Sequence, residues 1–363
     1  MSVKTIPQSK IGSEEPIFAS SLYTREPLAL PRQQFCLTPC SVGYPYGTIF
    51  DKGCVVMIDF KPVTPDRKEE LLPYLRHGGA RGCEFSFGNL CMWGSQKAAV
   101  VANRLVLFAR WGGKCVYPFP VGPGDLKPAV DAILADAAER DIPCRITGLV
   151  GDEGEQLEKL YPGKFHFHWS RDGFDYVYEI DALADLKGKK LQKKRNHVNR
   201  FWENHPDCTV AALDDANVAR VRAFAEDWYA RRLEEDPYAE FDLERRALDR
   251  ALRHWKALDM EGLLLLEGDR LLAFTMGSPL SDTVFDIHFE KADGDTDGAY
   301  AAVNREFARY LRDRHPGLQF LDREEDMGLE GLRRAKLSYK PHHLVEKYRA
   351  CVKENGCGDP IPL

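Results

Sequence analysis

The sequence predicts an α/β (α+β) protein made of two fused domains, each with a mixed central sheet flanked by helices. Two observations carry this prediction. The chain has 363 residues, whereas one domain commonly holds about 100 to 200. A similar order of strands and helices also occurs twice along the chain, in halves without obvious sequence identity. Because the repeat is long and occurs only twice, it indicates a fused pair of folds rather than a solenoid.

The composition is that of a folded protein with reduced cysteines. Hydrophobic residues make up 44% and charged residues 29% of the chain, which is typical of globular domains. The formal net charge of -6 argues against a surface built wholly for nucleic acid, so any polyanion site must be local. The 10 cysteines show no pattern of metal-ligand spacing, and we predict no metal site.

Hydropathy gives an expectation about location. The first residues contain no apolar run suited to a secretory signal, and no stretch reaches the roughly 18 apolar residues that a membrane-spanning helix needs. We therefore expect a cytoplasmic protein without an integral membrane segment.

The first half divides into an N-terminal extension over 1–54 and a first domain over 55–180. A Gly-Gly pair between two β-rich runs predicts a hairpin, and a proline in the first turn with apolar residues at helical spacing predicts the following helix. The expected elements, in order, are a helix at 69–75, a strand-like run at 83–93, strands at 104–111 and 114–120, a helix from 125, a strand at 144–150, a helix at 152–160 and a strand at 175–180.

The second domain is expected over 181–352, with a tail at 353–363. Apolar runs separated by turn residues predict its strands, and helical spacing of apolar residues predicts its helices. The expected elements are helices at 216–234 and 243–258, strands at 263–266, 271–277 and 283–290, a helix at 298–314, a strand at 318–322, a helix at 329–338 and a last strand at 343–348.

The strand-like run TVFDIHFE places three titratable side chains on one face. Asp286, His288 and Glu290 alternate with phenylalanine and isoleucine. A histidine between carboxylates suits general acid/base catalysis, because such groups exchange protons near neutral pH. We take Glu290 and His288 as candidate catalytic residues. The alternative is an ordinary polar sheet face in contact with solvent.

The run KGKKLQKKRNHVNRFW is strongly basic and contains aromatic residues. Phosphate contacts from lysine and arginine together with aromatic stacking are how such a segment would bind tRNA. The candidates for binding this donor are Lys193, Lys194, Arg195, Asn196, His197 and Asn199. A solvated basic helix face is the alternative interpretation.

A third group of candidates lies around the predicted strand at 318–322. Charged residues at the carboxyl end of a buried strand, followed by a glycine turn and a basic helix, occur where α/β sheets place ligands. Asp322 is the candidate catalytic residue of this segment. The candidates for binding substrate are Arg323, Glu324, Asp326, Lys336, Tyr339 and Asn304. Helix capping and salt bridges would explain the same charges without a ligand.

Three long motifs carry a family resemblance. KKRNHVNRFW, FEKADGDTDGAYAAVNREF and DREEDMGLEGLRRAKLSYKP resemble segments of bacterial proteins with the phosphatidylglycerol lysyltransferase C-terminal domain. The resemblance runs from about Met57 to Tyr348. It implies two fused acetyltransferase-like (GNAT-type) domains, and it places the loop from Asp322 to Asp326, with Lys336, near a transfer site.

The resemblance also implies an activity. Membrane-bound relatives move an aminoacyl group from charged tRNA to a lipid, which needs no metal or bound cofactor. We therefore expect an acyltransferase whose donor is aminoacyl-tRNA or acyl-coenzyme A and whose acceptor is a small molecule or a lipid headgroup. Two alternatives stay open, an acetyl-coenzyme-A-dependent N-acetyltransferase and a non-catalytic module that binds a metabolite or tRNA. The sequence lacks the glycine-rich pattern of acetyl-coenzyme-A enzymes.

Overall fold

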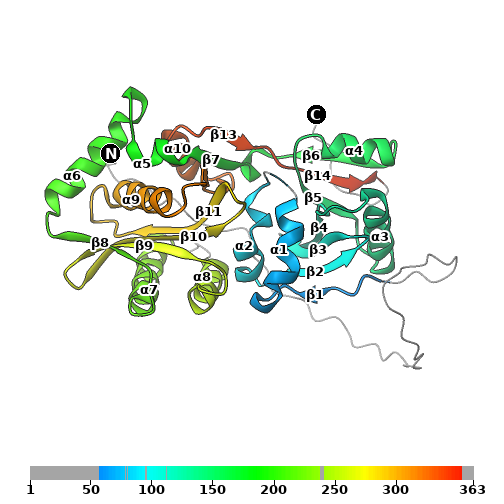
Figure 1. Ribbon diagram of the computed structural model, residues 1–363, viewed down its shortest axis with the longest axis horizontal. Helices are drawn as coiled ribbons and strands as arrows, with labels where there is room; N and C mark the ends of the chain where they lie inside the picture. The colour runs from blue at the N-terminus through cyan, green and yellow to red at the C-terminus, as the bar shows by residue number, and fades with distance from the viewer. Residues whose placement is uncertain are drawn as a thin grey trace, which may run out of the picture.

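The computed structural model describes residues 57–353 except 78, 80, 95, 112 and 238–240. The expected extension over 1–54 lies outside these residues, as does the expected tail beyond 353. The described part forms two seven-stranded mixed sheets with helices on their faces (Figure 1). This confirms the predicted fold class, a fused pair of α/β units.

The first sheet has the strand order β1-β2-β3-β4-β5-β14-β6. Its strands are β1 (Lys61–Pro62), β2 (Lys97–Val101), β3 (Arg104–Trp111), β4 (Lys114–Pro118), β5 (Arg145–Leu149), β6 (Phe165–Trp169) and β14 (Tyr348–Val352). Strands β4 and β5 run parallel, and the other neighbours run antiparallel. Helices α3 (Leu126–Glu139) and α4 (Glu153–Leu160) cover one face over an apolar cluster. The opposite face is covered by α1 (Lys68–His77) at β3.

The segment at 83–93 is helical, so the prediction of a strand there was wrong. A short 3-10 helix, η2 (Cys83–Phe85), leads into α2 (Phe87–Met92). The side chain of Ser86 accepts a hydrogen bond from the backbone N–H of Asn89 at 3.2 Å and caps α2. Every residue of α2 is buried, which removes the periodicity that separates a buried helix from a buried strand. Because α2 contacts α8 and β10 of the second half, it lies between the two halves (Figure 1).

The second sheet has the strand order β13-β7-β12-β11-β10-β9-β8. Its strands are β7 (Asp175–Glu179), β8 (Cys208–Ala212), β9 (Glu261–Glu267), β10 (Arg270–Pro279), β11 (Val284–Ala292), β12 (Phe320–Asp322) and β13 (His343–Val345). Strands β11 and β12 form its parallel pair. Among the strands of both sheets, β1, β2, β6 and β8 had not been predicted.

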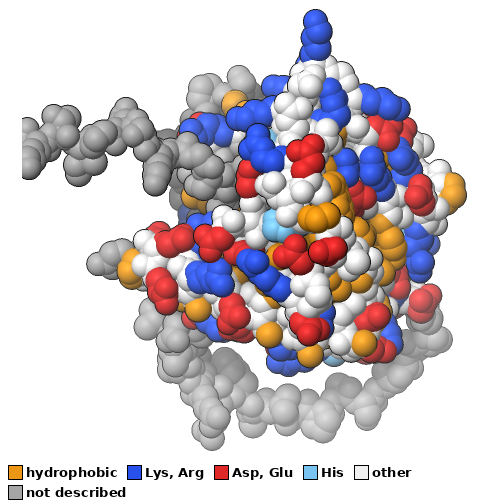
Figure 2. Space-filling model, turned by 90° about the vertical axis from the view of Figure 1, so that its left-hand side faces the viewer, with side chains coloured by type: hydrophobic (Ala, Val, Ile, Leu, Met, Phe, Trp, Pro, Cys, Tyr) orange, Lys and Arg blue, Asp and Glu red, His pale blue; other side chains and the backbone are white. Residues whose placement is uncertain are grey.

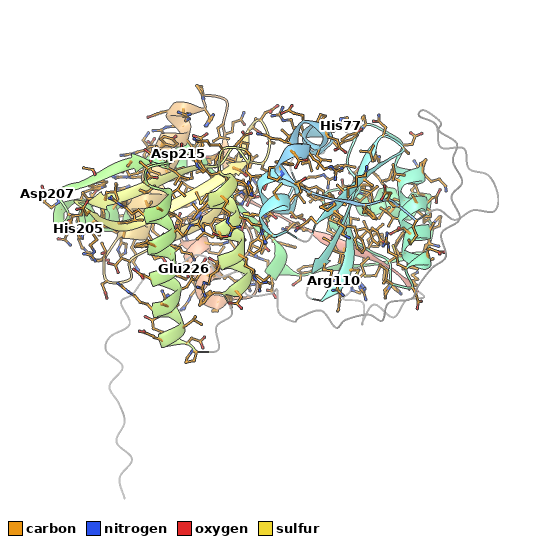
Figure 3. The ribbon with its side chains drawn as sticks, turned by 90° about the horizontal axis from the view of Figure 1, so that it is seen from below. His77, Arg110, His205, Asp207, Asp215 and Glu226 are labelled. Atoms are coloured by element: carbon orange, nitrogen blue, oxygen red, sulfur yellow. The ribbon has the colours of Figure 1, made fainter. Side chains whose placement is uncertain are left out.

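Helices cover both faces of the second sheet (Figure 1). On one face lie α5 (Ile180–Asp185), α6 (Gln192–Asn204) and α9 (Ala299–Arg314). On the other, α7 (Val218–Glu235) and α8 (Asp242–His254) lie side by side, as Figure 3 shows with Glu226 labelled on α7. The last helix, α10 (Glu330–Ser338), follows β12. The predicted helices of this half are confirmed within a few residues, and α5 and α6 are additions.

The two sheets exchange strands. β7, which we expected in the first domain, pairs with β12 and β13 of the second sheet. β14 lies between β5 and β6 of the first sheet, so the single last strand expected at 343–348 is in fact two strands in different sheets. The boundary expected at 180 therefore does not separate the sheets, and the division of the chain into domains at that residue stays a prediction.

Within the described ranges, no helix combines the length and the apolar character that are needed to cross a membrane.

Candidate functional site

The parallel strands β11 and β12 bring the predicted catalytic side chains together. Their pairing runs from Val284 with Phe320 to Asp286 with Asp322. Beyond this point β11 continues to His288 and Glu290, while the chain leaves β12 into the loop 323–329. Ligand sites commonly lie at the carboxyl ends of parallel strands, and this is where most of the candidates lie.

The polar face of β11 is buried, so its interpretation as a solvated sheet face was wrong. Asp286 is 0%, His288 3% and Glu290 1% exposed. Helix α2 of the first half of the chain helps to bury this face. Gly88 of α2 lies so close to β10 that an added methyl group would be 2.3 Å from Oγ of Ser278. Burying these ionisable groups is costly unless they are paired, which points to a specific role.

A chain of hydrogen bonds passes through His288. Its Nε2 lies 2.8 Å from Oγ of Ser278 and its Nδ1 lies 3.2 Å from Oε1 of Glu324. Oδ2 of Asp286 is 3.4 Å from the same Nδ1. Burial lowers the pKa of His288 to about 3, so the imidazole is neutral, with one nitrogen donating and the other accepting. Such a serine, histidine and carboxylate chain can pass a proton.

Three carboxyl groups of this site, those of Asp322, Glu324 and Asp286, have raised pKa values. Burial, opposed by a hydrogen bond from the backbone of Glu324, raises the pKa of Asp322 to about 7. Burial and repulsion from Glu325 raise the pKa of Glu324 to about 8. The pKa of Asp286 is also raised, by burial and by Glu324. Groups that titrate near neutral pH suit acid/base catalysis.

Glu290 is held by two partners. Its Oε1 accepts from Nη2 of Arg323 at 3.0 Å, and its Oε2 accepts from Nδ2 of Asn304 at 3.0 Å. The guanidinium of Arg323 also lies 4.8 Å from the ring centre of Tyr339 and 5.6 Å from that of Tyr178. Nε and Nη1 of Arg323 have no hydrogen-bond partner among the described residues. The predicted catalytic role of Glu290 stays a prediction, and Arg323 retains donors that a substrate oxygen could use.

Lys336 holds the loop after β12. Its Nζ donates to the backbone carbonyls of Arg323 at 2.5 Å, Glu324 at 3.1 Å and Glu325 at 2.6 Å. Burial lowers the pKa of this amine to about 8. An ammonium group has three N–H donors, so these bonds favour positioning of the loop over direct contact with substrate.

Asp326 also has structural partners. It accepts hydrogen bonds from Nε and Nη2 of Arg333 at 2.8 Å each and from the hydroxyl of Tyr176. These contacts agree with the salt-bridge alternative for this residue, whereas its predicted contact with substrate stays a prediction.

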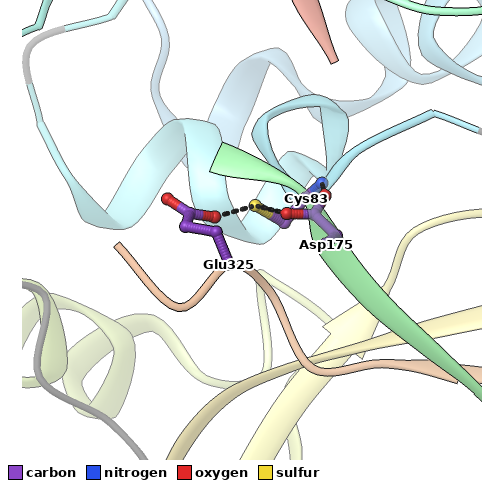
Figure 4. Close-up of side chains that lie close together, drawn as sticks. All are labelled: Cys83, Asp175 and Glu325. Carbon is purple, nitrogen blue, oxygen red and sulfur yellow. Dashed lines mark hydrogen bonds between the residues drawn. The ribbon is translucent and has the colours of Figure 1, made fainter. Parts of the chain in front are cut away.

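A second cluster joins the two sheets beside the first. Lys347, just before β14, lies 2.8 Å from Asp175 of β7 and 3.0 Å from Glu84. The thiol of Cys83 lies 3.3 Å from Glu325 and 3.7 Å from Asp175 (Figure 4). Burial and the neighbouring carboxylates raise the pKa of Cys83 well above its ordinary value, so this cysteine is a thiol and not a nucleophile.

Two groups of side chains converge closely enough to hold a cation, although we predicted no metal. They are Cys83 with Asp175 and Glu325, and Asp286 with His288 and Glu324, each with ligand atoms within 4.8 Å of one another. In the first group the ammonium of Lys347 already supplies the positive charge. In the second group, the raised pKa values of Glu324 and Asp286 favour bound protons, which reduce the negative charge there.

The basic segment is helical over α6, and Lys194 of this helix contacts the site. Nζ of Lys194 lies 4.3 Å from the ring centre of Tyr339. Arg195 donates to backbone carbonyls of residues 186 and 188, and His197 lies 3.7 Å from Asp297. Lys193, Asn196 and Asn199 are exposed. The end of the molecule that carries α6 shows Lys and Arg side chains interspersed with Asp and Glu (Figure 2).

Sequence reasoning missed several residues of the site. Ser278 lies near the end of a mostly apolar strand, and a polar residue in that position was only a weak local signal. Asp175, Lys347 and Glu84 are far apart in sequence, and no local pattern marks them as neighbours.

Comparison with known proteins agrees with this fold. The sequence profile described as phosphatidylglycerol lysyltransferase, C-terminal, matches residues 76–351. The crystal structure of a conserved protein of unknown function from Bacteroides thetaiotaomicron is 36% identical and has a TM-score of 0.77, covering 82% of this chain and 100% of that one. An uncharacterized protein of Mycoplasmoides gallisepticum is 27% identical over 242 residues, 61% of this chain and 75% of its own. The structure of L-PGS from Bacillus licheniformis is 16% identical with a TM-score of 0.58, covering 78% of this chain and 91% of that one.

Proposed function

Because the chain belongs to the family of the phosphatidylglycerol lysyltransferase C-terminal domain, we propose that it transfers an aminoacyl group from a charged tRNA to an amine or hydroxyl acceptor. The hydrogen-bond chain of Ser278, His288 and Glu324 lies where β11 and β12 diverge, and it is the observation that carries the proposal. Its serine and histidine are buried and Glu324 is partly buried, so it supplies what such a transfer needs, a proton relay with little contact to water.

In the proposed reaction, a new bond to the acceptor replaces the ester bond to tRNA, and one proton is transferred. The acceptor's nitrogen or oxygen attacks the ester carbonyl, a new C–N or C–O bond forms, and the ester bond to the tRNA ribose breaks. The acceptor loses a proton and the ribose oxygen gains one. We assign this proton to Glu324, because its pKa of about 8 lets it exchange near neutral pH. His288 and Ser278 orient the carboxyl and extend the relay.

Arg323 is the proposed partner of the developing oxyanion. Its guanidinium is buried, and Nε and Nη1 lack acceptors within the described part of the chain. Preorganised donors in a water-excluded site stabilise charge that develops in a transition state. Glu290 and Asn304 would then fix the orientation of Arg323, and Lys336 would fix the loop that carries it.

We place the donor on the side of α6. Lys193 and Asn196 are exposed on this helix, and Lys194 contacts Tyr339, which packs on Arg323. Phosphates bound along α6 would therefore lead toward the catalytic side chains.

The test is turnover with two donors. The full chain is incubated with a mixed pool of charged tRNA and, separately, with acetyl-coenzyme A, in the presence of amine and hydroxyl acceptors. Loss of acyl group and product mass are measured. We expect turnover of charged tRNA, slowed by about 10²- to 10⁴-fold in Glu324→Gln. Glu330→Gln, which changes an exposed glutamate in the same region, is the matched control.

Other results would favour other functions. Turnover of acetyl-coenzyme A alone would assign an N-acetyltransferase. A shift of the melting temperature with charged tRNA but no turnover would assign a binding module, and no response to either donor would reject both enzymatic assignments.

A further inference from the structure

The first sheet has a cavity on the face opposite α3 and α4. Its volume is about 420 Å³, and strands β4, β5, β14 and β6 contribute to its walls. The apolar side chains of these strands point to the helix-covered face, where Tyr117, Ile146 and Ala350 lie in one cluster. The cavity on the other face is lined by Val116, Trp169 and Tyr348 as well as by polar and charged residues. The charged and polar side chains that line the cavity are Lys114, Arg145, Thr147, His168, Arg349, Lys347 and Glu84.

The cavity carries an excess of positive charge. Glu84 is its one acidic lining residue among those described, and Lys347 neutralises it at 3.0 Å. Within the described chain, Lys114, Arg145 and Arg349 have no carboxylate in ion-pair contact. Three cations without counterions therefore face one hollow, in a protein whose net charge is -6.

A buried histidine reaches the same hollow. His168 of β6 stands opposite Arg349 of β14 in the strand register. It is 4% exposed, and its Nε2 has no hydrogen-bond partner among the described residues. A buried polar atom without a partner is costly. A ligand atom in the cavity would satisfy Nε2, and the surrounding guanidinium groups select an anion.

The cavity adjoins the candidate site. Lys347 and Glu84 line it, and Lys347 also contacts Asp175 and Glu325. Glu325 follows Glu324 directly. The cavity and α6 lie on opposite sides of the buried carboxylates, because α6 is at the far end of the molecule from the first sheet (Figure 1).

We propose that this cavity binds a phosphate ester carried by the acceptor. This inference rests on the proposed function, because only a transfer reaction has an acceptor. The donor of that reaction is the one placed at α6. Arginine matches a phosphate group with paired N–H donors, and Arg145 and Arg349 lie on neighbouring strands of the cavity wall. A phosphate held there directs the rest of a small acceptor toward Glu324.

The test measures binding without any donor, so it is independent of turnover. The full chain is titrated calorimetrically with inorganic phosphate, sn-glycerol 3-phosphate and AMP at low ionic strength. We expect at least one ester to bind more tightly than inorganic phosphate. Arg145→Gln and Arg349→Gln are each expected to weaken that ester by about ten-fold or more, because each removes a charge-assisted contact.

Arg110→Gln is the matched control. Arg110 belongs to the same sheet (Figure 3) and is exposed. Its partner in the strand register is Cys115. Because Lys114 and Val116, on either side of Cys115, line the cavity, the side chains of Cys115 and Arg110 face away from it. This variant should bind like the parent chain. Arg349 is exposed, so its replacement should leave folding intact, and circular dichroism verifies this.

Each outcome decides the proposal. Preference for glycerol 3-phosphate identifies a headgroup-type acceptor and preference for AMP a nucleotide, and either supports the site if the two cavity variants lose binding and Arg110→Gln does not. Equal binding of inorganic phosphate and both esters contradicts the ester assignment. Undetectable binding, or binding unchanged in both cavity variants, overturns the site. If binding is confirmed but no donor turns over, the proposed reaction fails and the anion site stands.

Discussion

The two sheets have equivalent strand orders and opposite chemistry. Each has a central parallel pair, β4 with β5 in the first and β11 with β12 in the second. Beside the first pair lies an open face with unpaired cations, whereas beside the second lies a buried face with carboxyl groups whose pKa values are raised. The two sheets thus share a strand order and differ in which face the rest of the chain covers.

Lys347→Met should have the largest effect, because it removes the cation that joins the two sheets. Asp175 and Glu84 would lose their charged partner in a buried place. Breaking a buried ion pair costs about 3–5 kcal/mol, measurable as a fall in the free energy of unfolding in urea. Lys187→Met breaks an exposed pair with Asp185 and should cost less than about 1 kcal/mol. Equal losses in both variants would contradict the role of Lys347 at the junction.

Gly88→Ala should disturb the packing of α2, which helps to cover the buried polar face of β11. The added methyl group would lie 2.3 Å from Oγ of Ser278 and 3.1 Å from Cε of Met260, so α2 or β10 must shift. Overpacking of this kind costs about 1–3 kcal/mol, and the shift should also reduce turnover. Gly294→Ala, with no atom within 4 Å, serves as the control in urea denaturation. A stable and fully active Gly88→Ala would show that the contact between the halves is loose.

The buried carboxyl groups should make stability depend on pH. Burial raises the pKa of Glu324 to about 8 and, against a backbone hydrogen bond, that of Asp322 to about 7. Between their ordinary values and these raised values, these two carboxyl groups bind more protons in the folded chain than in the unfolded chain. The free energy of unfolding should therefore fall as pH rises toward 8. Glu324→Gln should make this decline shallower in urea titrations from pH 5 to 8, and an unchanged slope would show that Glu324 is not the titrating group.

A charge reversal on α6 should have the smallest effect of these changes. It tests whether the second half of the chain, and not the first sheet, binds tRNA. Lys193→Glu with Lys194→Glu should weaken tRNA binding and lower its salt dependence by about two released counterions, because the phosphates lose two cations. Filter binding over a range of salt concentrations measures this. Arg145→Gln in the first sheet should leave tRNA binding unchanged. If Arg145→Gln weakens tRNA binding more than the α6 variant does, the donor and acceptor sides are reversed.

The sequence predicted most of the fold and part of the site. Local patterns identify strands such as β10 and β11 and helices such as α3 and α9, because alternation and helical spacing are local properties. The alternation along β11 identified the face on which His288 lies, and the catalytic role of that face stays a prediction. The run 83–93 failed because burial on all sides removes periodicity.

Residues that meet across the two sheets could not be predicted in this way. Lys347, Asp175 and Cys83 meet only through the exchange of β7 and β14, and no spacing in the chain encodes that pairing. Ser278 could not be distinguished from a strand-end serine until β11 placed His288 beside it. Long-range pairing thus decides the parts of the site that local patterns leave open.

The exchange of β7 and β14 bears on how the protein unfolds. β14 lies between β5 and β6, so a fragment ending at 180 would leave β6 detached and carry β7 without a sheet. A fragment starting at 181 would lack β7, which separates β12 from β13. For this reason, we do not expect either half to fold independently when it is expressed from one continuous stretch of chain. We therefore expect a single cooperative transition on heating, with coincident loss of both sheets, in place of the two steps that a simple tandem of domains would give.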